Sequence, residues 1–335
     1  MQNNLTKKEI NNLYNWAKKY DIKELKTKDK NKLLNIKELT LGELFRAEKN
    51  FSYIPNEIFK LVNLKELYIN SINLKALPKD IGNLINLEEL VIGGDCKLKK
   101  LPKEIGKLTN LKKLEISYEK SNELPKELFN LTNLKEFEIR SENLEKLPKE
   151  ICNFSKLEDI EIACENLKEL PHEIGNLKKL KDFTLWESNL KKIPKEFGNL
   201  INLEYFKIYS SYSLKEFPKE IANFTKLIHL TIECYKMKEL PREIGNLINL
   251  KSLYIKSANL KELPKEIKNL VNLERIDIIW DGYAKGLPNE ILNFEKLKFI
   301  EIKKSEFIYK SFGREYKIEK AKKKIKKNIN KTKKG

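Results

Sequence analysis

One stretch, LPREIGNLINLKSLYIKSANLKE at residues 240–262, recurs with variations along most of the chain. Eleven copies follow one another at a spacing of 23 residues, with 24 in three copies, and all eleven prolines of the protein occupy the second position of this unit. Since no proline falls elsewhere, the repetition is not a chance alignment, and one repeated structural element must account for most of the fold. The copies begin at Ile54, Leu77, Leu101, Leu124, Leu147, Leu170, Ile193, Phe217, Leu240, Leu263 and Leu287.

Each unit combines two kinds of local pattern. Around Leu250, Leu253 and Ile255, apolar and polar residues alternate, which predicts a short strand with one buried face. Proline fits the first position of a helical turn, because its missing N–H has no partner there and its φ is already helical. An acidic residue follows two positions after every proline, where the helix dipole favours negative charge. We therefore predict stacked strand–loop–turn units, with the turn helical or 3₁₀ and all strands parallel.

The pattern LxxLxIxxxNLKxLPxEIxNLxNL, over residues 36 to about 302, resembles the leucine-rich repeat family. It is most similar to the 23-residue subclass with a Leu-Pro step, seen in intracellular scaffolds and bacterial proteins. The resemblance implies an α/β solenoid, a curved horseshoe with a parallel sheet of about twelve short strands on its concave side and helical or 3₁₀ turns on its convex side. It further implies a binding platform rather than an enzyme.

One feature departs from the family pattern. The family usually places Asn nine positions from the first Leu of the strand motif, where its side chain bonds loop backbone. In this chain other residues stand there, and Asn comes one residue later in five units, at Asn73, Asn143, Asn166, Asn189 and Asn259.

The sequence divides into three regions. Residues 1–35 form a predicted capping helix and basic connector, residues 36–302 the repeats, and residues 303–335 a C-terminal cap and lysine-rich tail. Thr6 and Glu9 have the spacing of a capping box, and Leu5 and Ile10 that of a hydrophobic staple. We expect this helix to cover the open end of the repeat core; a separate recognition helix is the alternative.

The formal charge of +18 lies mainly at the two ends. Residues 1–35 hold nine lysines against four acids, and residues 303–335 hold fourteen basic residues against three acids, which leaves the repeats at +2. The last segment, 317–335, has isoleucines at near-helical spacing among lysines. A basic amphipathic helix of this kind can bind nucleic acid or an anionic membrane, whereas a cap continuing into a solvated tail is the simpler interpretation.

Several function classes find no support in the sequence. The two histidines and four cysteines fit no catalytic pair, metal-site spacing or compact disulfide framework. No loop suited to cradling phosphates occurs, so we expect a non-enzymatic monomer without metal or cofactor. No apolar run reaches the roughly 18–20 residues of a membrane span, and the N-terminus lacks a signal-peptide pattern. We therefore expect a cytoplasmic protein, with signal-less export as an effector as the alternative.

The concave face supplies the candidate site. Side chains at the third, fifth and seventh places of the strand motif should point outward, and over twelve strands these places hold twelve acidic and six basic residues. Carboxylates fall at equivalent places of successive strands, and aromatic residues follow them. We therefore predict a partner-binding site comprising Glu115, Glu136, Glu138, Asp159, Glu161, Asp182, Trp186, Tyr205, Tyr209, Tyr254 and Trp280.

Exposed Trp and Tyr are typical of binding hot spots, and surrounding charges orient the partner. The sequence therefore favours a protein-binding scaffold whose concave face takes a basic or mixed-charge polypeptide. The alternative is binding of nucleic acid or anionic membrane through the lysine-rich tail, which would weaken steeply with salt.

Overall fold

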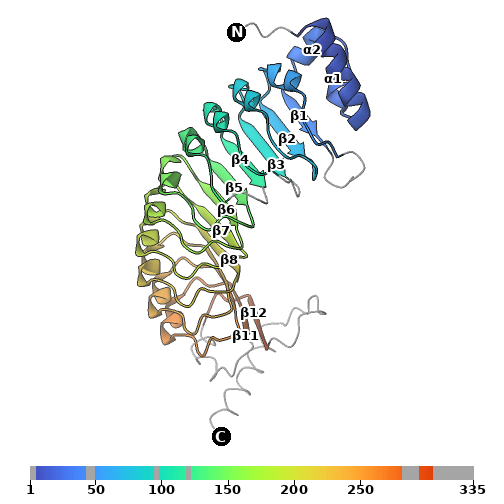
Figure 1. The fold of residues 1–335 in the computed structure, drawn as a ribbon. Helices are drawn as coiled ribbons and strands as arrows, with labels where there is room; N and C mark the ends of the chain where they lie inside the picture. Colours follow the sequence, from blue (N-terminus) through green and yellow to red (C-terminus); the bar gives the residue numbers. More distant parts are fainter. Residues whose placement is uncertain (1–4, 43–49, 94–97, 118–121, 281–293, 305–335) are drawn as a thin grey trace. The chain divides into compact units, whose positions relative to one another are not determined.

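The structure, a computed structural model, describes residues 5–42, 50–93, 98–117, 122–280 and 294–304. It contains two compact units, Met1–Glu165 and Asn166–Gly335, each of which is considered by itself. Twelve strands are described; all of them are parallel and follow one another in chain order (Figure 1). Strands alternate with 3₁₀ turns, which confirms the predicted leucine-rich-repeat architecture.

The described residues of the first unit form two α-helices, six strands and several short 3₁₀ turns. Its helical elements are α1 (Lys7–Tyr20), η1 (Lys23–Leu25) and α2 (Lys30–Leu34). Its strands are β1 (Glu38–Leu41), β2 (Glu66–Asn70), β3 (Glu89–Gly93), β4 (Lys113–Ser117), β5 (Glu136–Arg140) and β6 (Asp159–Ala163). The 3₁₀ turns between strands are η3 (Asn56–Lys60), η4 (Lys79–Asn83), η5 (Lys103–Lys107), η6 (Lys126–Asn130) and η7 (Lys149–Asn153).

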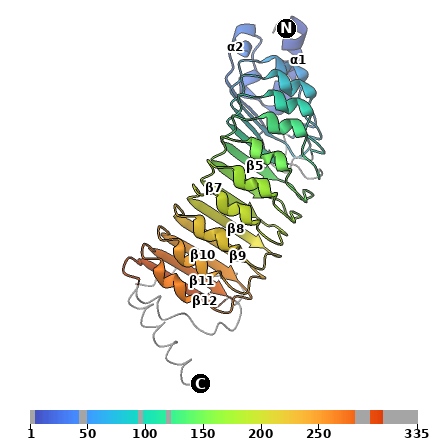
Figure 2. The same cartoon turned by 90° about the vertical axis from the view of Figure 1, so that its left-hand side faces the viewer.

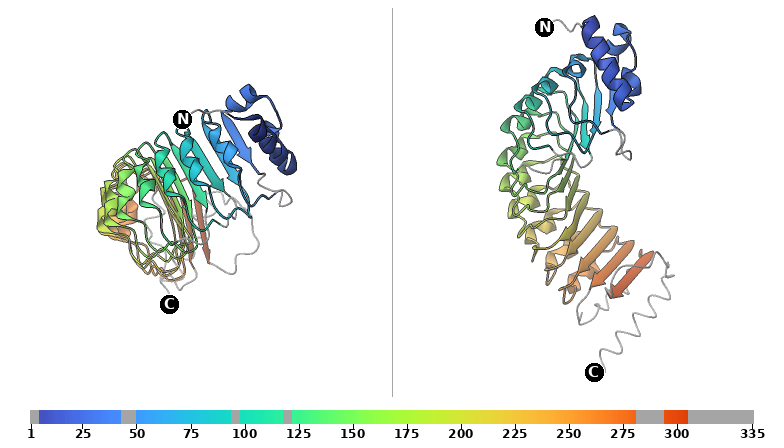
Figure 3. Two further views of the ribbon diagram at one scale, coloured as in Figure 1. Left: turned by 45° about the horizontal axis from the view of Figure 1, so that its top comes forward. Right: turned by 45° about the vertical axis from the view of Figure 1, so that its right-hand side comes forward.

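The second unit continues the same alternation. Its strands are β7 (Asp182–Trp186), β8 (Tyr205–Ser211), β9 (His229–Cys234), β10 (Ser252–Ser257), β11 (Arg275–Trp280) and β12 (Phe299–Lys304). Its 3₁₀ turns are η8 (His172–Asn176), η9 (Lys195–Asn199), η10 (Lys219–Asn223), η11 (Arg242–Asn246) and η12 (Lys265–Asn269). Within this unit the turns cover one face of the sheet (Figure 2), and the strands lie side by side (right-hand view of Figure 3).

The position of proline differs from the prediction by one residue. Each of the ten described prolines precedes its 3₁₀ turn as the N-cap, with an extended backbone, as at Pro241 with φ −62° and ψ 142°. Its carbonyl accepts the first bond of the turn, from the Ile244 N–H at 3.1 Å. Proline's fixed φ suits this extended residue equally well. Within the turn, a Cβ at Gly245 would lie 2.4 Å from the carbonyl oxygen of Glu266, so glycine permits the close approach of the next turn.

The core follows from the repeat. Leu250, Leu253 and Ile255, at the first, fourth and sixth places of the strand motif, are buried, as are the equivalent residues of the strands from β2 to β11. In the second unit, aromatic rings fill the space between strand and turn; Phe197, for example, lies 5.0 Å from Phe206 between ring centroids. Because every repeat buries its apolar face on its neighbours, stacking rather than any single repeat stabilises each unit.

An asparagine ladder lies before the strands rather than after them. Seven asparagines that immediately precede the first Leu of the strand motif donate from Nδ2 to a backbone carbonyl of the preceding repeat at 2.7–2.9 Å. They are Asn63, Asn86, Asn110, Asn133, Asn202, Asn249 and Asn272. Where lysine replaces Asn, as at Lys226, its Nζ instead contacts Oδ1 of the preceding Asn202 at 2.7 Å. These bonds satisfy loop carbonyls that no strand pairs.

After the strands, a small buried residue at the eighth place bonds the loop backbone. Ser71 Oγ donates to the Phe51 carbonyl at 2.6 Å, and Ser257 Oγ donates to the Met237 carbonyl at 2.9 Å. Among the displaced asparagines, Asn259 donates from Nδ2 to the Tyr235 carbonyl at 2.8 Å. Serine at the eighth place therefore performs part of the role that the family assigns to Asn.

The N-terminal helix α1 lies beside β1 in the first unit (left-hand view of Figure 3). Its predicted capping box is present, because Thr6 Oγ1 accepts from the Glu9 N–H and the Glu9 carboxylate accepts from the Thr6 N–H. Leu5 and Ile10, the predicted staple, are both buried. The inner face of the helix buries Ile10, Leu13, Trp16 and Ala17.

Candidate protein-binding site

Five of the predicted site residues lie together in the first unit, and we call them the carboxylate face: Glu115, Glu136, Glu138, Asp159 and Glu161. They occupy β4, β5 and β6, three neighbouring parallel strands. The register places Glu115 beside Glu138 and Glu138 beside Glu161, with Glu136 beside Asp159 in the other row. The predicted juxtaposition of like charges on one face is therefore present in this unit.

Two basic side chains lie among these carboxylates. Arg140 Nη2 lies 2.5 Å from Glu138 Oε1 and 3.7 Å from Glu161 Oε1, so one guanidinium serves two carboxylates. Lys113 Nζ lies 3.2 Å from Glu89 Oε1 and 3.9 Å from Glu136 Oε2. Burial, and next the charge of Glu138, raise the pKa of Glu115 above its usual value. The like charge of Glu138 therefore adds to burial in opposing the ionisation of Glu115.

Five further predicted residues lie in the second unit, and we call them the aromatic face: Asp182, Trp186, Tyr205, Tyr209 and Tyr254. They come from β7, β8 and β10. Trp186 and Tyr209 stack with ring centroids 4.0 Å apart and an interplanar angle of 15°. Trp186 nevertheless remains 37% exposed. This pair offers a preformed apolar surface, since stacking has already fixed both rings.

The aromatic face also contains residues that the sequence analysis missed. His229 on β9 stacks on Tyr205 with centroids 5.0 Å apart, and Tyr235 stacks on Tyr212 at 5.3 Å. Burial, and next the charges of Lys207 and Lys251, lower the pKa of His229. The signal was available in the sequence, since His229 occupies the same third place of its strand motif as Tyr205.

Ion pairs on the aromatic face are more enclosed than those on the carboxylate face. Lys207 Nζ lies 2.6 Å from Asp182 Oδ2 and 5.3 Å from the Tyr205 ring centroid. On β9 and β10, Glu233 Oε1 accepts from the Tyr235 hydroxyl at 2.6 Å and from the Lys256 ammonium. Burial opposes the charge on Lys256, but hydrogen bonds to Glu233 and Tyr235, together with the negative charge of Glu233, outweigh it and raise the lysine pKa.

Tyr254 lies beside this network. It is in register with Thr231 on β9 and with Asp277 on β11. Burial, and next the charge of Glu233, raise the pKa of the Tyr254 phenol. Tyr254 is therefore half-buried among its neighbours on the aromatic face.

Two further predictions fall outside the described residues. Trp280 ends β11 in register with Ser257, and its side chain is not among those described. The lysine-rich tail, residues 317–335, also lies outside the described ranges. The roles of Trp280 and of the tail stay predictions.

The cysteine thiols are poorly suited to chemistry. Burial raises the pKa of Cys164 and of Cys234 to about 12, so neither forms a thiolate readily. Three described cysteines are free: Cys152, Cys164 and Cys234. Over the described ranges, no group of three or more His, Cys, Asp or Glu side chains is arranged to hold a metal ion. No described helix combines the length and apolar character that crossing a bilayer demands.

Parallel strands, 3₁₀ turns and an outward-facing sheet surface define a leucine-rich-repeat solenoid. A family model described as "Leucine-rich repeat region" matches residues 15–145 and 137–243. The chain therefore belongs to the leucine-rich repeat family. Domains of this family generally act as protein-binding scaffolds and are typically non-catalytic.

Solved structures with the same fold come from several sources. A leucine-rich repeat protein of Leptospira interrogans is 25% identical, with a TM-score of 0.53, covering 90% of this chain and 89% of that one. The internalin InlF of Listeria monocytogenes is 18% identical with a TM-score of 0.64, covering 91% and 98%. The Arabidopsis receptor kinase HAESA, solved with the peptide hormone IDA and the co-receptor SERK1, is 22% identical with a TM-score of 0.57, covering 81% and 50%. No curated protein matches the chain by sequence.

Proposed function

We propose that the chain is a non-enzymatic scaffold that binds a basic or mixed-charge polypeptide through the outward-facing side chains of its sheet. The observation that carries this proposal is the stacked Trp186–Tyr209 pair, of which Trp186 is 37% exposed. Trp and Tyr are the residues most enriched among the hot spots of protein interfaces. Rings already held by stacking lose little conformational freedom when a partner covers them.

The charges suggest the chemistry of the partner. The carboxylate face holds five acidic side chains, and its basic residues Arg140 and Lys113 are each shared between two carboxylates. Burial, and next the charge of Glu138, raise the pKa of Glu115, and a Lys or Arg of the partner would favour its ionised form. Complementary charge also speeds association and excludes acidic competitors. The peptide complex of HAESA agrees with a polypeptide ligand, although that similarity extends to the fold alone.

Affinity capture with matched variants tests the proposal. Intact protein, Trp186→Ala with Tyr209→Ala, Glu138→Lys, and the control Ile248→Ala would each be used to capture partners from native lysate. Ile248 is 51% exposed but precedes the strand motif, so it stands at none of the outward places of the strands. We expect one defined protein to be lost with the face variants and retained with Ile248→Ala. Its retention by all variants would contradict the site.

A chain ending at Tyr316 separates this proposal from binding through the tail. If the tail carries the function, truncation removes the captured material, particularly nucleic acid or anionic lipid, and the face variants retain it. If the faces carry it, the truncated chain captures the same protein as the intact chain.

A further inference from the structure

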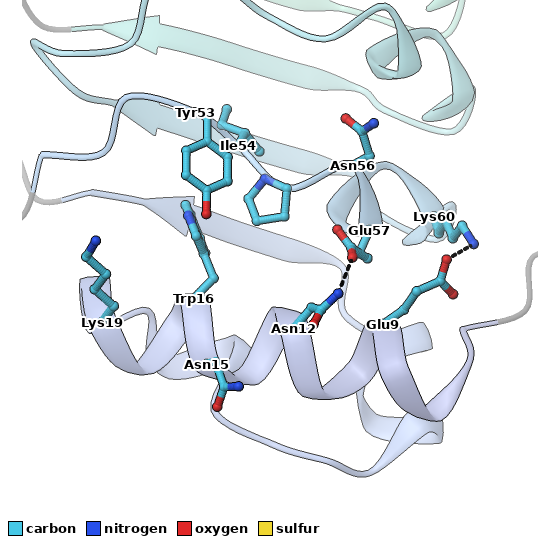
Figure 4. A pocket seen from close by; sticks show the side chains of 11 residues that line it. Glu9, Asn12, Asn15, Trp16, Lys19, Tyr53, Ile54, Asn56, Glu57 and Lys60 are labelled. Carbon is cyan, nitrogen blue, oxygen red and sulfur yellow. Dashed lines mark hydrogen bonds and ion pairs between the residues drawn. The ribbon is translucent and has the colours of Figure 1, made fainter.

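A trough between α1 and the first 3₁₀ turn of the repeats forms a second candidate site within the first unit (Figure 4). Its volume is about 720 Å³, within the range of roughly 300–1,000 Å³ that is common for ligand pockets. Helix α1 contributes Glu9, Asn12, Asn15, Trp16 and Lys19; the opposite wall contains Tyr53, Ile54, Pro55, Asn56, Glu57 and Lys60. None of these residues belongs to the carboxylate face or the aromatic face.

The polar groups at one end of the trough are already paired. Lys60 Nζ lies 2.5 Å from Glu9 Oε1, and Asn12 Nδ2 donates to Glu57 Oε1 at 3.3 Å. Figure 4 shows both interactions bridging α1 and η3. This end therefore joins the helix to the repeats and offers little unused bonding capacity.

At the other end, Trp16 carries an unused hydrogen-bond donor. Its side chain is only 5% exposed, packed 5.3 Å from Phe51 between ring centroids. Within the described structure, its buried Nε1 has no hydrogen-bond partner. Buried indole N–H groups usually find an acceptor, and leaving one unpaired costs free energy. An oxygen atom supplied by a ligand would recover that cost.

Tyr53 lines the same end of the trough as Trp16. Figure 4 shows the Tyr53 ring beside Trp16, with the phenolic oxygen near the indole. Tyr53 is 58% exposed, so moving the ring sacrifices little packing.

Lys19 gives this end a positive charge. It is one turn beyond Trp16 on the helix face that lines the trough, and its Nζ lies 5.1 Å from the Tyr20 ring centroid. No ion pair to Lys19 is formed by the described residues. An N–H donor beside an ammonium favours an oxygen acceptor with negative charge.

We propose that this end of the trough binds a carboxylate of an extended peptide, with Trp16 Nε1–H donating to it and Lys19 balancing its charge. Glu9 and Lys19 are ten residues apart on α1, which corresponds to about 15 Å along the helix. About four extended residues span that length. The ligand thus differs in charge from the basic partner proposed for the faces.

Three peptides distinguish the possible sources of the carboxylate. They are acetyl-tetraalanine with a free C-terminus, its C-terminal amide, and an amidated peptide with one alanine replaced by aspartate. The readout is the Trp16 indole N–H resonance, assigned by its loss in Trp16→Phe. We expect a downfield shift that saturates with a Kd on the order of 1 mM or tighter. A shift with the free acid indicates a terminal carboxylate, and one with the aspartate peptide indicates a side chain.

Two outcomes overturn the proposal. The first is an indole resonance that no peptide moves at about 10 mM, roughly ten times the expected Kd. The second is an equal shift with the neutral amide, since binding would then not require a carboxylate. Because Trp16 is in the first unit, Trp186→Phe should leave the titration unchanged.

A lysine pair supplies the matched control. Lys18→Met and Lys19→Met remove the same charge from adjacent exposed positions of α1, but only Lys19 lines the trough. We expect Lys19→Met to weaken peptide binding about fivefold, as for loss of an exposed ion pair, and Lys18→Met to leave the Kd unchanged. If both variants weakened peptide binding equally, the effect would come from the overall charge of the helix, which would contradict a contact between Lys19 and the carboxylate.

Discussion

The carboxylate face and the aromatic face use the same outward places of the same repeat, but they differ in how well their ion pairs are enclosed. In the first unit, the Lys113 and Glu136 side chains are 40% and 58% exposed. In the second, those of Lys256 and Glu233 are 20% and 11% exposed. Aromatic neighbours account for the difference, since Lys256 Nζ lies 5.4 Å from the Tyr235 ring centroid. A charged side chain at an outward place of the repeat is thus either exposed to solvent or buried in an ion pair, depending on the side chains beside it.

The largest expected effect is on the enclosed network. Lys256→Met leaves Glu233 nearly buried without its cation, and only the Tyr235 hydroxyl still donates to that carboxylate. We expect a loss of about 2–4 kcal/mol in the free energy of unfolding, measured by urea denaturation at pH 7.

Lys113→Met on the carboxylate face is the matched control. Its ion pairs are largely solvated, so we expect a change of less than about 1 kcal/mol. Similar losses for the two variants would show that enclosure by aromatic rings does not distinguish the faces. Adding Glu233→Gln to Lys256→Met should recover part of the loss, because it removes the stranded charge.

A smaller effect is expected for the stacked rings of the aromatic face. A double-mutant cycle on Trp186→Ala and Tyr209→Ala should give a coupling free energy of about 0.5–1.5 kcal/mol, typical of an aromatic pair. The measurement is again urea denaturation of the two single variants and the double variant. Trp186 with Tyr254, which lie on non-adjacent strands, should give a coupling near zero; equal couplings would exclude a specific stack.

The repeat explains why the fold could be predicted from the sequence, whereas the burial of ion pairs on the outward side of the sheet could not. Apolar residues at three fixed places of each strand determine which side chains point outward, and Glu115, Glu138 and Glu161 lie in register as expected. Burial of an outward residue depends instead on the side chains beside it. Thr184 and Glu233 stand at outward places, yet both are buried; the long side chains of Lys207 and Lys256 stand at the paired positions of the next strand.

The loops on either side of the strands show a second feature that the sequence alone did not predict. A missing family Asn after the strand drew attention to the loop there, whereas the backbone bonds are distributed between Asn before the strand and Ser at the eighth place. Both signals recur in the sequence. Their partners, carbonyls one repeat earlier, became identifiable only once neighbouring repeats were placed against each other.

The smallest expected effect concerns Glu115 on the carboxylate face. Its pKa is raised in the folded protein, first by burial and then by Glu138, so the folded state retains the proton to higher pH than the unfolded chain does. Stability therefore falls as pH rises from the unfolded value of about 4.3 through the folded pKa. Glu115→Gln removes this loss and should stabilise the protein by about 0.2–1 kcal/mol at pH 7.

The pH dependence distinguishes charge from packing in this last prediction. Below about pH 4, Glu115 is largely protonated in both the folded and the unfolded state of the unsubstituted protein. The stability advantage of Glu115→Gln should therefore disappear there. Urea denaturation at pH 7 and near pH 3.5 measures the difference. Glu136→Gln, which removes an exposed carboxylate 3.9 Å from Lys113, should not stabilise the protein. A gain for Glu115→Gln that persisted at low pH would mean that the carboxylates of this face do not repel one another, and would remove the electrostatic reason for a basic partner.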